Sequence, residues 1–180
     1  MQFEKLSIDG LILIHHDVHG DERGYFVEDY NKNDFVAGGI DCDFVQDNRS
    51  YSQYGTLRGL HFQKGEHSQA KLVKVLEGKV LDVVVDMRKY STTFGQHFSI
   101  ELQAGDGLSF FIPRGFAHGF VVLSESALFS YKCDNFYNKN SDAGVFYGDK
   151  NLGIDWKINN FILSDKDKIL PNFCDAFVFE

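Results

Sequence analysis

Two histidines stand where side chains could transfer protons or bind a metal. His61 lies in Leu57-Arg-Gly-Leu-His-Phe-Gln63, where polar and apolar residues alternate, and His118 follows the turn sequence Pro113-Arg-Gly115. An imidazole serves as a general acid or base near neutral pH, or binds a metal when neutral. His118 could equally be a hydrogen-bonded core histidine, and the sequence leaves both alternatives open.

The residues around these histidines resemble the two motifs of the cupin jelly rolls. The second motif is matched by Gly107, Pro113, Gly115 and His118, and the frame of the first by Gly55, His61 and Gly78. Metal-binding cupins carry a second His and a Glu where this chain has Gln63 and Lys71. A divalent cation prefers imidazole and carboxylate ligands, and a lysine ammonium repels it. The resemblance therefore implies a jelly-roll cavity without a metal site, in which His61, Lys71 and His118 act as organic groups.

The elements that must position these groups read as β-strands. Period-two alternation predicts strands over 71–77 and 79–88 joined as a hairpin at Glu77-Gly78-Lys79, and further strands over 97–102, 108–112, 119–123 and 127–133. Short helices are expected near 31–37 and 164–169. If 57–63 is a strand, Arg58 and His61 share a face only with a bulge, and Gly59 is the residue suited to one. We expect one domain over residues 1–180 of the all-β class, a cupin-type double-stranded β-helix (jelly roll) with a few short helices.

A closer resemblance covers nearly the whole chain. In the order of the family, the matching stretches are Gly20-Asp-Glu-Arg-Gly24, Phe44-Val-Gln-Asp-Asn48, Leu57-Arg-Gly-Leu-His-Phe-Gln63, Gln69-Ala-Lys-Leu-Val73, Asp82-Val-Val-Val-Asp-Met-Arg88, Ile112-Pro-Arg-Gly-Phe-Ala-His-Gly-Phe120, Tyr131-Lys132, Gly153-Ile-Asp-Trp156 and Leu163-Ser-Asp-Lys-Asp167. They are similar to the dTDP-4-dehydrorhamnose 3,5-epimerases, metal-free cupins that act on dTDP-4-dehydro-6-deoxy-D-glucose. The resemblance implies a homodimer with strands exchanged between subunits.

The chemistry of that family explains the residue types. A ketone at C4 acidifies the hydrogens at C3 and C5, so epimerisation needs a base, an acid on the opposite face and a donor near the ketone oxygen, but no redox cofactor. The resemblance implies that His61 is the base, that Asp167 orients its imidazole, that Tyr131 donates the proton and that Lys71 supports the oxyanion. By periodicity alone, Tyr131 reads as an aromatic residue on a core-facing strand.

Substrate contacts follow from the same resemblance. It implies that Arg23, Arg58 and the Gln46, Asp47 and Asn48 segment contact the diphosphate and sugar, that Glu28 and Tyr137 contact thymine, and that His118 and Asp142 make further contacts. An arginine fork suits phosphate because it binds two oxygens at once. Without the resemblance, each exposed Arg or Glu reads as a solvated surface charge.

Composition excludes several other classes. The 180 residues carry a formal net charge of −8, which argues against nucleic-acid or anionic-membrane binding. Three widely spaced cysteines and the absence of a long apolar segment predict a cytoplasmic protein. The alternatives are a C3-only or C5-only epimerase or ketoisomerase on a related 4-keto-deoxysugar nucleotide, a non-catalytic sugar-nucleotide-binding cupin, and a metalloenzyme cupin.

Overall fold

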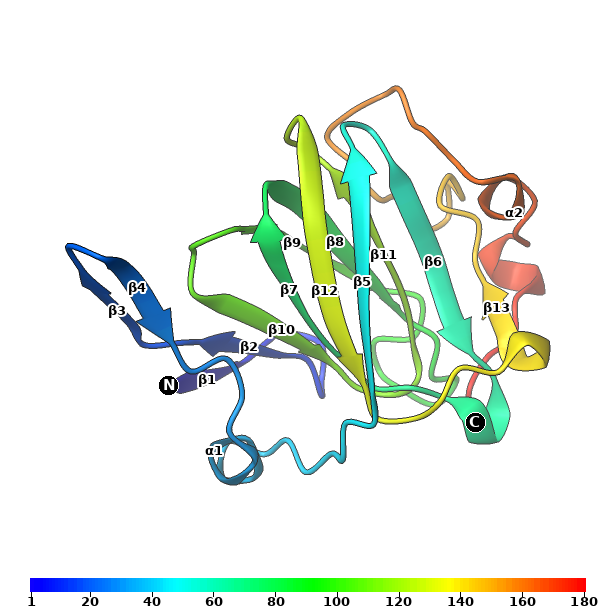
Figure 1. The fold of residues 1–180 in the computed structure, drawn as a ribbon. Helices are drawn as coiled ribbons and strands as arrows, with labels where there is room; N and C mark the ends of the chain where they lie inside the picture. The colour runs from blue at the N-terminus through cyan, green and yellow to red at the C-terminus, as the bar shows by residue number, and fades with distance from the viewer.

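The computed structural model describes residues 1–180 and consists mainly of antiparallel strands in two facing sheets (Figure 1). In spatial order, the six-stranded sheet contains β1 (Gln2–Lys5), β2 (Ile12–His15), β10 (Leu108–Ile112), β7 (Lys71–Glu77), β12 (Ser126–Cys133) and β5 (Gln46–Gln53). The five-stranded sheet contains β13 (Asp142–Gly144), β6 (Leu57–Gln63), β11 (Phe116–Val122), β8 (Lys79–Asp86) and β9 (His97–Gln103). The expected all-β, cupin-type architecture is confirmed.

The helical segments are short, as expected. They are α1 (Lys32–Ala37), α2 (Asp165–Lys168) and the 3-10 helices η1 (Gly65–His67), η2 (Lys139–Ser141) and η3 (Phe173–Asp175). Asn31 caps α1 and Ser164 caps α2, each by accepting a hydrogen bond from a backbone N–H of the first turn. None of these helices is long or apolar enough to span a membrane.

Large apolar side chains fill the space between the sheets. Phe110 and Phe129 from the six-stranded sheet meet Val84 and Phe120 from the five-stranded sheet, and the rings of Phe120 and Phe129 stack 4.2 Å apart. The other face of the five-stranded sheet is covered by the C-terminal part of the chain, including Trp156. Strand β8 is therefore buried on both faces, which explains why its sequence is apolar from Val80 to Val85 except at Asp82.

The predicted hairpin at Glu77-Gly78-Lys79 is wrong. Strands β7 and β8 lie in different sheets, so Gly78 marks a corner where the chain crosses the sandwich. Gly78 has a φ of 75°, and a Cβ there would lie 2.0 Å from the carbonyl oxygen of Ser126. Alternation identifies strands but not their partners, and a glycine between two strands suits a corner as well as a hairpin. The other predicted strands are confirmed, although β11 begins at Phe116, before the expected Gly119.

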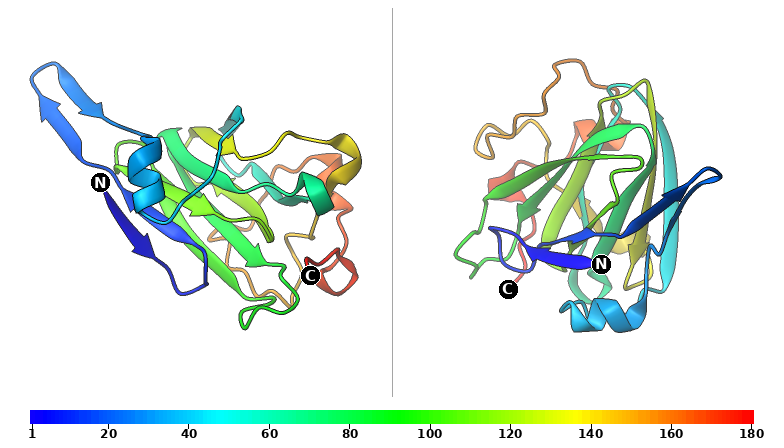
Figure 2. Two further views of the ribbon diagram at one scale, coloured as in Figure 1. Left: turned by 90° about the horizontal axis from the view of Figure 1, so that it is seen from below. Right: turned by 90° about the vertical axis from the view of Figure 1, so that its left-hand side faces the viewer.

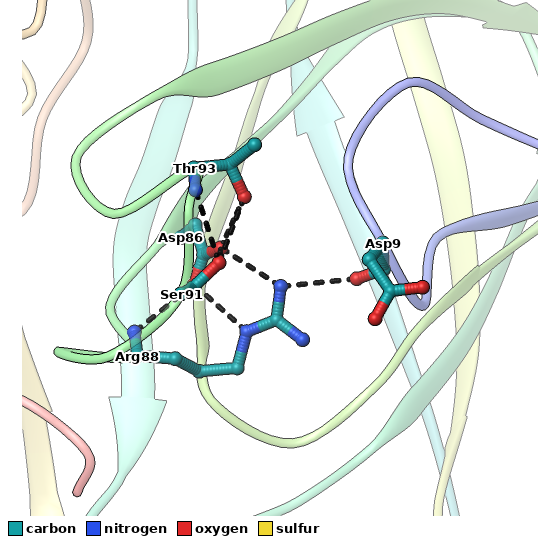
Figure 3. Close-up of polar contacts among 5 residues, drawn as sticks. All are labelled: Asp9, Asp86, Arg88, Ser91 and Thr93. Atoms are coloured by element: carbon teal, nitrogen blue, oxygen red, sulfur yellow. Dashed lines mark hydrogen bonds and ion pairs between the residues drawn. The ribbon is translucent and has the colours of Figure 1, made fainter.

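Asp86, at the end of β8, holds the loop that follows it in place through hydrogen bonds (Figure 3). Its buried carboxylate accepts hydrogen bonds from Arg88 at 2.8 and 2.9 Å and from the hydroxyls of Ser91 and Thr93, both at 2.7 Å. Arg88 also donates to the carbonyl of Asp9 at 3.0 Å, which ties in the N-terminal region. Burial opposes ionisation of Asp86, but these hydrogen bonds outweigh it and lower its pKa to about 2.

Strands β3 (Val18–Asp21) and β4 (Gly24–Val27) form a separate hairpin that projects from the two sheets (Figures 1 and 2). All of its residues except the half-buried Val27 are exposed, including the aromatic rings of Tyr25 (68% exposed) and Phe26 (69%). We call this hairpin the arm. Exposed aromatic residues on a projecting element are typical of a surface that another chain covers.

Candidate active site

Two cavities lie between the sheets, and they share His61, Lys71 and Tyr131. The first, of about 380 Å³, is also lined by Arg58, His118 and Asp167. The second, of about 340 Å³, is also lined by Gln46, Asn48, Gln63, Tyr137, Asp142 and Lys166. The fold therefore brings together all four of the predicted catalytic residues and most of the predicted substrate contacts.

His61, on β6, is paired with a carboxylate from the far end of the sequence. Its Nε2 lies 2.5 Å from Oδ1 of Asp167 on α2. The other oxygen of Asp167 accepts a hydrogen bond from the Ser164 hydroxyl at 2.7 Å, and the side chain of Asp167 is only 4% exposed. Burial opposes ionisation of Asp167, but the hydrogen bonds from His61 and Ser164 outweigh it and lower its pKa. An ionised Asp167 accepts the proton of Nε2, which leaves Nδ1 of His61 free to act as a base.

His118 forms a second histidine–carboxylate pair. It lies opposite His61 in the β6–β11 register, and its Nε2 donates to both oxygens of Asp82 on β8, at 2.9 and 3.1 Å. Both side chains are buried, and burial lowers the pKa of His118 despite the neighbouring carboxylate. His118 is therefore a hydrogen-bonded core histidine that also lines the first cavity.

The six-stranded sheet supplies the groups on the opposite wall. Lys71 on β7 and Tyr131 on β12 line both cavities. Burial lowers the pKa of Lys71, and burial also raises the pKa of Tyr131, aided by Cys133, so that the phenol keeps its proton at neutral pH. The predicted base, His61, and the predicted acid, Tyr131, thus lie on opposite sheets and line the same cavities.

Arg58 reaches the first cavity because β6 is irregular at Gly59. His61 lies opposite His118 and Arg58 opposite Phe120, so Gly59 and Leu60 together face only Gly119. A Cβ at Gly59 would lie 2.4 Å from the Cα of Gly119. The predicted bulge is confirmed, and it allows Arg58 and His61 to line one cavity.

Ser52 accepts a hydrogen bond from Nε of Arg58 at 3.0 Å, and neither Arg58 nor Lys71 takes part in an ion pair. Both cations are available to an anionic ligand.

The second cavity is lined by amide side chains and by Tyr137, whose position is fixed by hydrogen bonds. The side-chain oxygen of Gln46 accepts from the backbone N–H of Tyr137 at 3.0 Å, and the Tyr137 hydroxyl donates to Asp142 at 3.2 Å. Asp142 is also ion-paired with Lys166. Tyr137 remains 54% exposed, so its ring is anchored at both ends and still accessible for stacking.

Three predicted substrate contacts do not reach the cavities within one chain. Arg23 lies in the turn of the arm and is ion-paired with Asp21, and Glu28 follows the arm and is exposed. The side chain of Asp47 points to the outer face of β5 and is ion-paired with Lys132 at 3.0 Å. For Asp47 the reason is the strand period, which turns its side chain away from the face of its neighbours Gln46 and Asn48.

Sequence reasoning missed Asp82, Lys166 and Ser164 as residues of the site. A carboxylate within the apolar run Val80–Val85 was a usable signal for Asp82, because a buried charge requires a partner. Ser164 and Lys166 both precede Asp167 in a predicted helix start, but no local pattern shows that Lys166 faces the second cavity. Their roles become visible only when α2 is placed against β6.

A histidine–carboxylate base on one sheet and a phenol on the other, with a lysine ammonium beside them, can remove a proton next to a carbonyl and return one to the opposite face. The fold and the site thus define an isomerase of the epimerase type on a cupin-type jelly roll. Residues 5–175 match the family model of dTDP-4-dehydrorhamnose 3,5-epimerase, and the chain belongs to this family.

Known proteins agree with this assignment over the full length of the chain. The dTDP-4-dehydrorhamnose 3,5-epimerase of Shigella flexneri is 45% identical over 180 residues, which cover 99% of each chain. The crystal structure of the enzyme of that name from Elizabethkingia anophelis is 54% identical, with a TM-score of 0.92 and 97% of each chain covered. A dTDP-6-deoxy-D-glucose-3,5-epimerase from Legionella pneumophila, solved in complex with dTDP-4-keto-L-rhamnose, is 43% identical, with a TM-score of 0.93 over 97% of this chain and 93% of that one.

Proposed function

We propose that this chain epimerises dTDP-4-dehydro-6-deoxy-D-glucose at C3 and C5 to give dTDP-4-dehydro-L-rhamnose. The observation that carries the proposal is the cavity in which His61 of the five-stranded sheet, paired with Asp167 of α2, faces Tyr131 and Lys71 of the six-stranded sheet. The relative from Legionella pneumophila, crystallised with dTDP-4-keto-L-rhamnose, supports the same substrate class.

The proposed mechanism moves protons only. Nδ1 of His61 removes the proton from the carbon next to the C4 ketone, and the electron pair of the C–H bond moves onto the ketone oxygen as an enolate. Lys71 stabilises this oxyanion, and Asp167 stabilises the imidazolium. The Tyr131 hydroxyl then protonates the carbon on its other face. Solvent takes up the proton held by the His61 imidazolium and returns one to the Tyr131 phenolate, which restores both groups. Two such cycles invert C3 and C5.

Solvent exchange tests this proposal directly. In heavy water, the protein should introduce deuterium at both C3 and C5 of the 4-keto sugar, as measured by NMR. Exchange at C3 or C5 alone would instead identify a mono-epimerase or ketoisomerase. A chain that exchanges neither carbon but binds dTDP would be a non-catalytic sugar-nucleotide-binding cupin. His61→Asn should abolish exchange and leave dTDP affinity largely intact.

We propose further that a homodimer completes the site, with the arm of one copy reaching the cavity of the other. Arg23 and Glu28 lie on or beside the arm and reach neither cavity in their own chain. The exposed aromatic residues of the arm support a covered position, and β5 is an edge strand next to the cavities that another chain could pair with. The three free cysteines agree with a reducing, cytoplasmic location.

Mixing two variant subunits tests whether the arm of one copy reaches the cavity of the other. His61→Asn disables the body and leaves the arm intact, whereas Arg23→Ala alters only the arm. If the arm acts on the partner, a mixed dimer contains one fully native site, and an equal mixture after subunit exchange should recover about a quarter of the native activity. Activity of the mixture no higher than the average of the two variants would show that each arm serves its own chain.

A further inference from the structure

One polar atom in the wall of the first cavity has no partner. The Oγ of Ser50 is shielded from solvent and makes no hydrogen bond, and it is the only buried side-chain nitrogen or oxygen in this condition. A buried polar group left without a partner destabilises the fold, so native structures contain few of them. An unpaired hydroxyl in the wall of a cavity indicates that its hydrogen-bond partner is an atom of the bound ligand.

Ser50 belongs to a row of polar side chains on the inner face of β5. In the β5–β12 register, Ser50 lies opposite Phe129, and Asn48 lies opposite Tyr131, so both face the space between the sheets. The other members of the row are already engaged. Gln46 donates to Asn48, and Ser52 accepts from Arg58. Only Ser50 remains unpaired, on a wall it shares with Arg58.

Arg58 indicates the chemistry of the missing partner. Ser52 holds its Nε at 3.0 Å, while the rest of the guanidinium makes no hydrogen bond or ion pair within the protein. A guanidinium edge and a hydroxyl that line the same cavity form a suitable donor set for one phosphate group. Rotation about a single side-chain bond changes the direction of a serine Oγ, so Ser50 can turn toward a ligand without movement of the backbone.

We propose that Ser50 donates a hydrogen bond to a phosphate oxygen of the nucleoside diphosphate sugar, beside Arg58. The inference rests on the proposed function, because it requires a diphosphate-bearing substrate in this cavity. It adds a substrate-binding residue that stays unsatisfied until the substrate binds. Ser50 thus favours the complex over the free enzyme.

Ser50→Ala tests the assignment, with the exposed Ser99→Ala on β9 as a matched control. A hydrogen bond to a charged group contributes enough that affinity for dTDP, measured by calorimetry, should fall roughly tenfold to hundredfold. Because the free enzyme loses only an unsatisfied hydroxyl, its melting temperature should stay the same or rise. Ser50→Cys, which keeps the shape but donates weakly, should fall between Ser50→Ala and the native chain in dTDP affinity.

Two results would overturn the proposal. Unchanged dTDP affinity, with a raised KM for the 4-keto sugar nucleotide, would assign the hydroxyl to the sugar and not to phosphate. A clear drop in melting temperature would show that Ser50 has a structural partner in the free enzyme. Failure of the proposed function is seen separately, as absence of deuterium exchange in the native chain.

Discussion

Replacement of Asp167 by Asn tests the central pair of the site. The substitution keeps the size of the side chain but removes its charge. Only the carbonyl oxygen of an amide accepts hydrogen bonds, whereas both His61 and Ser164 donate to the carboxylate. One of these two donors must therefore lose its acceptor, and His61 loses the charge that stabilises its protonated form.

The expected magnitude follows from the geometry. Asp167 is 4% exposed and its oxygen lies 2.5 Å from Nε2 of His61. Unit charges whose centres are roughly 4 Å apart attract by about 4 kcal/mol at an effective dielectric constant near 20. This attraction develops as His61 takes up the proton, so it lowers the barrier rather than the energy of the bound substrate. Its loss corresponds to roughly a thousandfold lower kcat.

Deuterium exchange at C3 and C5 measures this loss, and dTDP binding by calorimetry should remain unchanged. Asp165→Asn is the matched control, because Asp165 lies on the same short helix but is fully exposed and paired with Lys168. A kcat for Asp167→Asn within about tenfold of the native value would refute the role of the buried charge. An equal loss in Asp165→Asn would assign the effect to α2 as a whole.

Three further predictions concern single side chains. Tyr131→Phe should lower formation of the epimerised product by roughly 10²–10⁴-fold, because the protonated phenol is lost, whereas deuterium exchange initiated by His61 should persist. NMR measures both the amount of epimerised product and its deuterium content. An equal loss of product formation and of deuterium exchange would contradict the assignment. Ser164→Ala removes a hydrogen bond to the carboxylate, so it should raise the pKa of Asp167 and move the acidic limb of the pH profile of kcat to higher pH. Ser164→Thr, which keeps the hydroxyl, should restore the native profile. If the acidic limb does not move in Ser164→Ala, the role of Ser164 is limited to capping α2. Asp86→Asn should lower the free energy of unfolding by about 2 kcal/mol at pH 7, because the carboxyl is stabilised from its ordinary 3.8 to about 2. A carboxyl whose pKa is lowered by folding stabilises the fold at pH values above its pKa in the unfolded chain. The difference in unfolding free energy between Asp86→Asn and the native chain, measured by urea denaturation, should therefore shrink as the pH falls from about 4 toward 2. A difference that does not change with pH would contradict an origin in the Asp86 charge.

Much of the fold could be predicted because its signals are local. Alternation of apolar residues marked most of the strands that line the cavities, and both short α-helices were expected near their observed positions. The bulge at Gly59 was also predictable, since Arg58 and His61 could not otherwise share a face. Strand pairing was not local, and the hairpin predicted at Gly78 proved to be a corner between sheets.

The site divides in the same way. Resemblance to the family identified His61, Lys71, Tyr131 and Asp167, and all four line the first cavity. Asp82 was missed, although it holds His118, because strand periodicity does not show which charge across the sheet a buried histidine meets. Arg23 could be named from sequence, but its place outside the cavities of its own chain follows from the direction of the arm.

The sequence by itself determined the class of the protein. Motif spacing indicated a cupin-type jelly roll with a lysine in place of a metal-binding carboxylate, and the resemblance to the epimerase family implied an acid and a base for proton transfer. Only the tertiary structure decided which groups meet. Asp167 lies 106 positions from His61 along the chain, and their contact depends on how α2 packs against β6. The unpaired hydroxyl of Ser50 is likewise a property of its surroundings, because any serine has the same donor and only packing decides whether that donor finds a partner.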